Sequence, residues 1–140
     1  MTRNEARTIM MQILYELDAS GALTGEDPAG TARRLAGEKL VGNHGERGAD
    51  LLGNIVENLQ KIDDIINSCS SRWKTGRMPK VDLAIMRLAT GEMLFSEDIP
   101  EAVSVNEAIN LAKKFSTENS ARFVHGVLGS VTAGLKKDEE

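Results

Sequence analysis

Few cysteine, histidine, proline and aromatic residues occur in this chain of 140 residues. It holds one cysteine, Cys69, two histidines and three prolines, and 4% of its residues are aromatic. A single cysteine cannot form a disulfide within the chain, which favours a reducing compartment. No apolar run approaches the roughly 20 residues that span a membrane, and the opening MTRNEART has no apolar signal core. We therefore expect a cytoplasmic protein with no membrane partner.

Patterns that mark catalytic and metal sites are missing as well. His44 and His125 stand far apart, and neither has a ligand-type residue at metal-binding spacing. The elements GxSxG, HExxH and GxGxxG do not occur. The glycine-rich segment 37–48 contains no GK[ST], which favours a mobile loop over a phosphate cradle. We expect no enzyme, no catalytic residue, no metal and no cofactor.

The charge balance limits how the chain can bind nucleic acid. A net charge of −4 and a pI near 5.3 argue against a protein that coats nucleic acid by bulk attraction. Any RNA contact must be a local patch or must be shared with a basic partner. Arg72, Lys74, Arg77 and Lys80 form a run without an intervening acid. This run predicts a solvated connection between helices, which could equally assist RNA or a partner.

Apolar residues recur at helical spacing almost throughout, and no convincing strand period is present. We predict an all-α fold of about seven helices in a single compact domain, residues 1–140. Its two helical halves are expected at about 1–78 and 79–134, with residues 135–140 as a frayed tail.

Helix boundaries follow from local signals. A capping box from Thr2 to Glu5 predicts the first helix, which we expect to stop near Gly21. Asp27 and Pro28 predict the cap and first position of the second helix.

Similar signals mark the later helices. The fourth is expected from Ile62 to Trp73, and a capping box at residues 104–107 predicts the start of the sixth. Ser116 or Thr117 should open the last helix, which we expect to stop at Gly134. Pro79 predicts the start of the fifth helix, and Gly91 within that helix predicts close packing.

The C-terminal half carries a specific pattern of Asp-x-x-Ile-x-Arg-Leu-Ala, then D-I-P, N-E-A-x-x-L-A-K-x-F and F-V-x-G-V-L. The matching positions are Asp82, Arg87, Leu88, Ala89, Glu92, Leu94, Asp98-Ile99-Pro100, Asn106-Glu107-Ala108, Leu111-Ala112-Lys113, Phe115, Phe123-Val124 and Gly126-Val127-Leu128. Weaker matches occur around Leu14-Tyr15-Glu16 and residues 62–73. The chain resembles the NusB family of bacterial transcription antitermination factors over nearly its whole length.

The resemblance implies a function and a set of partners. NusB proteins bind a boxA sequence in nascent RNA of ribosomal RNA operons, together with NusE, a ribosomal protein of the small subunit. The complex then joins elongating RNA polymerase. We therefore expect single-stranded boxA-type RNA, NusE and the RNA polymerase elongation complex as partners.

Candidate RNA-binding residues combine cationic, aromatic and amide side chains. Phosphate contacts from arginine and stacking on aromatic rings are the usual means of holding single-stranded RNA. The candidates are Arg3, Arg7, Asn119, Ser120, Arg122 and Phe123. Phe123 is as readily explained as a core residue, and Arg122 as a solvated charge. Candidates for partner binding are Tyr15, Val81, Arg87 and Glu92.

Departures from the family pattern favour weak RNA binding by the isolated chain. Only Arg3 and Arg7 precede the first apolar stripe, whereas many members have a dense arginine-rich N-terminus. Gly91 and His125 also differ from the residues usual at their positions. An alternative is a protein–protein module or a homodimer with its RNA face hidden. The NusB-like domain of ribosomal RNA cytosine methyltransferases is disfavoured, because no cofactor-binding α/β domain follows.

Overall fold

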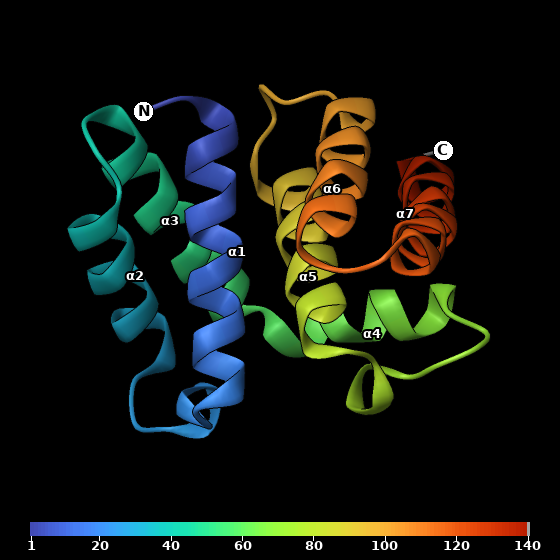
Figure 1. The fold of residues 1–140 in the computed structure, drawn as a ribbon, viewed down its shortest axis with the longest axis horizontal. Coiled ribbons are helices and arrows are strands. Elements are labelled where there is room, and N and C mark those ends of the chain that lie inside the picture. The colour runs from blue at the N-terminus through green and yellow to red at the C-terminus, as the bar shows by residue number, and fades with distance from the viewer. Residues whose placement is uncertain (140) are drawn as a thin grey trace.

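The computed structural model describes residues 1–139 and contains helices joined by short connections (Figure 1). The α-helices are α1 (Arg3–Ala19), α2 (Pro28–Lys39), α3 (Asn43–Glu57), α4 (Leu59–Cys69), α5 (Lys80–Phe95), α6 (Glu101–Phe115) and α7 (Glu118–Glu139). Two short 3-10 helices cover Ala22–Thr24 and Thr75–Arg77. No strand occurs in residues 1–139, so the predicted all-α class and the number of helices are confirmed. Within this range no helix has the length and apolar character needed to cross a membrane.

Helix α5 lies between two groups of helices (Figure 1). Helices α1, α2 and α3 pack on one another, and α1 and α3 also contact α5. On the other side α6, α7 and α4 pack around α5, with α4 contacting both α5 and α7. Packing therefore groups α4 with the C-terminal helices, whereas we expected the halves to divide near residue 78.

The buried middle of α5 explains its central place. Every residue from Asp82 to Glu92 is buried, including three charged side chains. A Cβ atom built on Gly91 would lie 2.2 Å from Cγ1 of Ile55, which is itself fully buried in α3. Glycine at position 91 thus allows α3 and α5 to approach closely, as the sequence predicted.

Three predicted helix starts are confirmed by their capping bonds. The Glu5 amide donates to Oγ1 of Thr2 over 3.1 Å, which caps α1. Asp27 caps α2, with Pro28 at its first position. The Ser120 amide donates to Oγ1 of Thr117 over 3.0 Å, so of the two alternatives Thr117 opens α7.

Two predictions about the N-terminal and middle parts of the chain were wrong. Residues 37–48 are not a loop, since α2 continues to Lys39 and α3 begins at Asn43. The turn needs glycine only at Gly42, where φ is +63°. The fourth helix ends at Cys69, which leaves Trp73 in the connection to α5.

Two further boundaries differ in the C-terminal half. Helix α6 begins at Glu101 directly after Pro100, so the pattern at residues 104–107 lies inside the helix and Ser104 is buried. Helix α7 continues past the expected stop at Gly134 to Glu139. Residue 140 lies outside the described residues.

Replacing Gly91 with alanine should destabilise the fold, because the new methyl group would overlap the buried side chain of Ile55. We expect the G91A variant to lose about 1–3 kcal/mol of unfolding free energy, as is usual for overpacking. Gly129 is the matched control, since it is exposed on α7 and no neighbouring atom lies within 4 Å of a built Cβ. The G129A variant should gain up to about 1 kcal/mol from helix propensity. Urea unfolding measures both, and equal effects would contradict the close approach of α3 and α5.

Candidate nucleic-acid interface

A hollow lies between the α4–α5 connection and α7, and we call it the α7 hollow. Its volume is about 290 Å³. It is lined by Cys69, Ser70, Ser71, Arg72, Arg122, Phe123, Gly126, Val127 and Ser130. Two guanidinium groups, several hydroxyl groups and an aromatic ring thus meet in one place, although they come from segments far apart in the chain.

An aromatic pair supports the wall of the α7 hollow. The rings of Trp73 and Phe123 lie edge to face, with their centroids 5.2 Å apart and an angle of 61° between them. The guanidinium of Arg72 lies 4.8 Å from the centroid of the Trp73 ring, within the range of a cation–π interaction. Phe123 is half-buried, so it both packs on Trp73 and lines the hollow.

Hydrogen bonds hold the connection that carries Arg72 and Trp73. The Ser70 hydroxyl donates to the Trp73 carbonyl over 2.6 Å. The Lys74 ammonium donates to the carbonyls of Asn67 and Ser70 over 2.9 Å and 3.1 Å. The basic run predicted as a solvated connection is therefore partly held in place by the hydrogen bonds of Lys74.

The remaining candidates near the start of α7 differ in exposure. The Arg122 side chain is 74% exposed and lies 4.0 Å from the Glu118 carboxylate, so its guanidinium is accessible to an anion. Asn119 is exposed one turn earlier. Ser120 is half-buried, and its hydroxyl accepts a 2.9 Å bond from Ser116.

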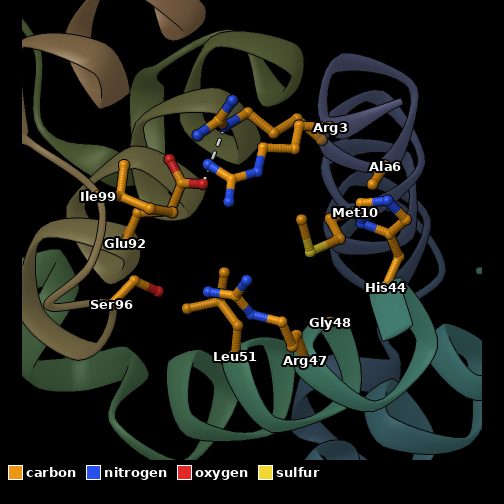
Figure 2. Close-up of a pocket in the computed structure, with 11 residues that line it drawn as sticks. Arg3, Ala6, Met10, His44, Arg47, Gly48, Leu51, Glu92, Ser96 and Ile99 are labelled. Atoms are coloured by element: carbon orange, nitrogen blue, oxygen red, sulfur yellow. Dashed lines mark hydrogen bonds and ion pairs between the residues drawn. The ribbon is translucent and has the colours of Figure 1, made fainter. Parts of the chain in front are cut away.

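A second hollow, the α1 hollow, lies between α1, α3, α5 and the connection from α5 to α6 (Figure 2). Its volume is about 90 Å³. It is lined by Arg3, Ala6, Arg7, Met10, His44, Arg47, Gly48, Leu51, Glu92, Ser96 and Ile99. The two hollows share no lining residue. The candidates Arg3 and Arg7 thus belong to a different site from Arg122 and Phe123. Asn119 and Ser120 line neither of these two hollows.

Arg7 and Glu92 form an ion pair at the floor of the α1 hollow. Nε of Arg7 donates to Oε2 of Glu92 over 2.9 Å, and their side chains are only 7% and 3% exposed. This geometry gives Arg7 an internal partner and places Glu92 away from the surface. Arg3, one turn earlier on α1, is exposed.

Arg87 also lies inside the protein. It donates to both carboxylate oxygens of Asp63 over 2.9 Å and 2.8 Å, and lies 3.5 Å from Asp18. Its side chain is 8% exposed. Arg87 thus joins α1, α4 and α5. Of the four candidates for partner binding, Val81 is half-buried and only Tyr15, at 37% exposure, lies open on the surface.

Arg72 and Trp73 were not among the candidate site residues. The basic run and the single tryptophan drew attention to the segment, but nothing local showed that it folds against α7. His44 and Arg47 were missed because their segment was predicted as a loop. Asp98 was noted only as part of the D-I-P pattern, although it pairs with Arg47, which lines the α1 hollow.

Fold and site together show a small all-helical protein with two hollows lined by arginine. Among residues 1–139, no three His, Cys, Asp or Glu side chains are grouped so that they could hold a metal ion. The NusB family model matches residues 4–133, and the chain belongs to the NusB family. The sequence resemblance is thereby confirmed, and the family is a non-enzymatic one.

Individual relatives agree with this assignment. The chain is 39% identical to the transcription antitermination protein NusB of Natranaerobius thermophilus, over 98% of this chain and 99% of the relative. The solved NusB structure from T. maritima matches with a TM-score of 0.81 and 33% identity, covering 94% of this chain and 90% of that one. A NusB chain in a complex of NusB, NusE and double-stranded RNA matches with a TM-score of 0.77 and 25% identity, covering 94% and 96%.

Breaking the buried pair of Arg7 and Glu92 should be costly. We expect E92A to lose about 3–5 kcal/mol of unfolding free energy, because Arg7 would remain buried without a counter-charge. The double variant R7M/E92L should recover most of this loss, since no charge is then left buried. The exposed pair of Arg33 and Glu57 is the control, and E57A should cost less than about 1 kcal/mol. Urea unfolding distinguishes the cases; a loss in E57A as large as in E92A would argue against this role for burial.

Proposed function

We propose that this chain is an RNA-binding transcription antitermination factor that binds RNA together with NusE. Its membership of the NusB family and its likeness to the NusB chain of the NusB–NusE–RNA complex support the proposal. The proposal in full is that the RNA is boxA-type RNA of ribosomal RNA operons. The assembly then acts in the cytoplasm on elongating RNA polymerase.

The observation that carries the proposal is the chemistry of the α7 hollow. Exposed Arg122 and Arg72 lie where they can neutralise phosphate groups. The ring of Phe123, supported by Trp73, can stack on an unpaired base. Asn119 can add a hydrogen bond to a base edge, since amide groups both donate and accept.

The acidic net charge explains why a partner is needed. With a charge of −4, the chain repels RNA at long range, and its attraction is limited to local arginines. A basic partner such as NusE would reverse that balance near the RNA. The isolated chain is therefore expected to bind weakly.

The variant R122A should weaken the binding of a boxA RNA oligonucleotide. Loss of one phosphate or stacking contact should lower the affinity about fivefold or more, and should reduce the slope of log K against log salt by about 0.7. The control is R34A, because Arg34 is likewise an exposed arginine paired within its helix, to Glu38, but lies on α2 away from both hollows. Fluorescence anisotropy at several salt concentrations measures both. Equal losses would show that only net charge matters.

Adding NusE should raise the affinity for boxA RNA well above that of the isolated chain. Anisotropy titrations with and without NusE test this, with a scrambled RNA of the same length as the control. Equal affinity in both arms would contradict the proposal.

Light scattering on the same samples tests the alternative of a homodimer with a hidden RNA face, which would bind RNA only as it dissociates.

A further inference from the structure

The basic residues of the run 72–80 have different partners in the folded protein. Arg72 lines the α7 hollow, and its guanidinium lies over the ring of Trp73. Lys80 pairs with Asp18 of α1 over 3.1 Å. Lys74 instead turns back toward the end of α4 and donates to backbone carbonyls there. The run is therefore not one uniform cationic surface, although its residues are similar in sequence.

The ammonium group of Lys74 caps the end of α4. It donates to the carbonyl oxygens of Asn67 and Ser70 over 2.9 Å and 3.1 Å. Carbonyls in the last turn of a helix lack partners within the helix and carry the negative end of its dipole. A cation placed there forms charge-assisted hydrogen bonds, which are roughly twice as strong as neutral ones. Lys74 is therefore bound to the protein itself.

These bonds close the turn that carries Arg72 and Trp73. The Ser70 hydroxyl donates to the Trp73 carbonyl over 2.6 Å, and the ammonium group of Lys74 returns to the Ser70 carbonyl. Residues 70–74 belong to no helix. The shape of the turn therefore depends on these side-chain bonds, because no regular backbone pattern supports it. Holding Lys74 in place fixes the two residues before it.

The α7 hollow has one wall on a helix and one wall on this turn. Arg122 and Phe123 belong to α7, whereas Ser71 and Arg72 belong to the connection from α4 to α5 (Figure 1). The backbone hydrogen bonds of a helix hold its side chains at fixed positions. The turn has no such support, so the edge-to-face contact of Trp73 with Phe123 depends on how the turn is held.

We propose that Lys74 is a positioning residue of the α7 hollow. Its ammonium group closes the turn at residues 70–74 and so places Arg72 and the Trp73–Phe123 pair for RNA, while Lys74 itself makes no contact with the RNA. This inference rests on the proposed function and deepens it, because it concerns the same site. A site that is held in its binding geometry loses less conformational freedom when the ligand binds.

Replacing Lys74 with methionine removes the ammonium group and keeps an unbranched side chain. With NusE present, K74M should bind boxA RNA about two- to tenfold more weakly than the unaltered protein, because the turn must then be ordered on binding. K74R should keep most of the affinity, since a guanidinium can donate to the same two carbonyls. Fluorescence anisotropy measures the affinities, and circular dichroism checks that each variant is folded.

Salt dependence distinguishes positioning from direct contact with phosphate. K61M is the matched control, because Lys61 is an exposed lysine of α4 that lines neither hollow. The slope of log K against log salt should be the same in K74M as in K61M. In R72A the slope should fall by about 0.7, as expected for the loss of one phosphate contact on a single strand.

Trp73 reports on the turn without any RNA, because it is the single tryptophan of the chain. Acrylamide should quench the fluorescence of Trp73 more readily in K74M than in the unaltered protein, since the ring is then held less firmly against Phe123. Quenching in K61M and K74R should match that in the unaltered protein.

Four results would overturn the proposal: equal RNA affinity of K74M and K61M, an equal loss in K74R and K74M, a salt slope of K74M as low as that of R72A, or unchanged quenching of Trp73 in K74M. Any of these, with RNA binding by the unaltered protein intact, leaves the proposed function standing. If the unaltered protein binds no RNA, the proposed function fails, whereas stronger quenching in K74M would still support the role of Lys74 in holding the turn.

Discussion

Buried ion pairs between α1 and α5 fix how the two groups of helices meet. Arg7 of α1 pairs with Glu92 of α5, and further along the same helices Arg87 lies beside Asp18. Such charges are expensive to bury and must stay paired, which penalises any other register of the two helices. Asp63 adds a two-bond contact to Arg87 and so includes α4 in the same network. These contacts set both the floor of the α1 hollow and the place of α5 in the core.

The two hollows follow from this arrangement in different ways. The α1 hollow lies where the N-terminal helices meet α5, so some of its arginines pair with carboxylates of the protein itself. The α7 hollow lies at the far group of helices, where the α4–α5 connection folds against α7. There Arg122 is exposed, and the guanidinium of Arg72 lies over the ring of Trp73. The second site therefore keeps its positive charge available for a ligand despite the acidic chain.

Local signals predicted helix starts well where only one reading of the pattern existed. Thr2 and Asp27 cap α1 and α2 because their side-chain oxygens accept hydrogen bonds from backbone amides of the first turn, those of Glu5 and Gly30. The predicted helix start at residues 104–107 was wrong because the same pattern also fits inside a helix. The fixed φ angle of Pro100 favours a helix start directly after it, and α6 begins there. The prediction of a loop at residues 37–48 was wrong because its glycines were interpreted as a sign of flexibility, whereas Gly48 is packed against Leu40 and Met10. Glycine content cannot distinguish a loop from a tightly packed helix.

Apolar spacing and the C-terminal motif were enough to establish the helical class and the family, because each of these two patterns lies within a short stretch of neighbouring residues. The roles of the charged residues were settled by folding. Arg3 and Arg7 are equivalent on one helix face, yet one is exposed and the other is paired with Glu92, a residue 85 positions away. Folding likewise brings Arg72 to the hollow that Arg122 lines. Burial and pairing arise from contacts between distant segments, so they are absent from any local pattern.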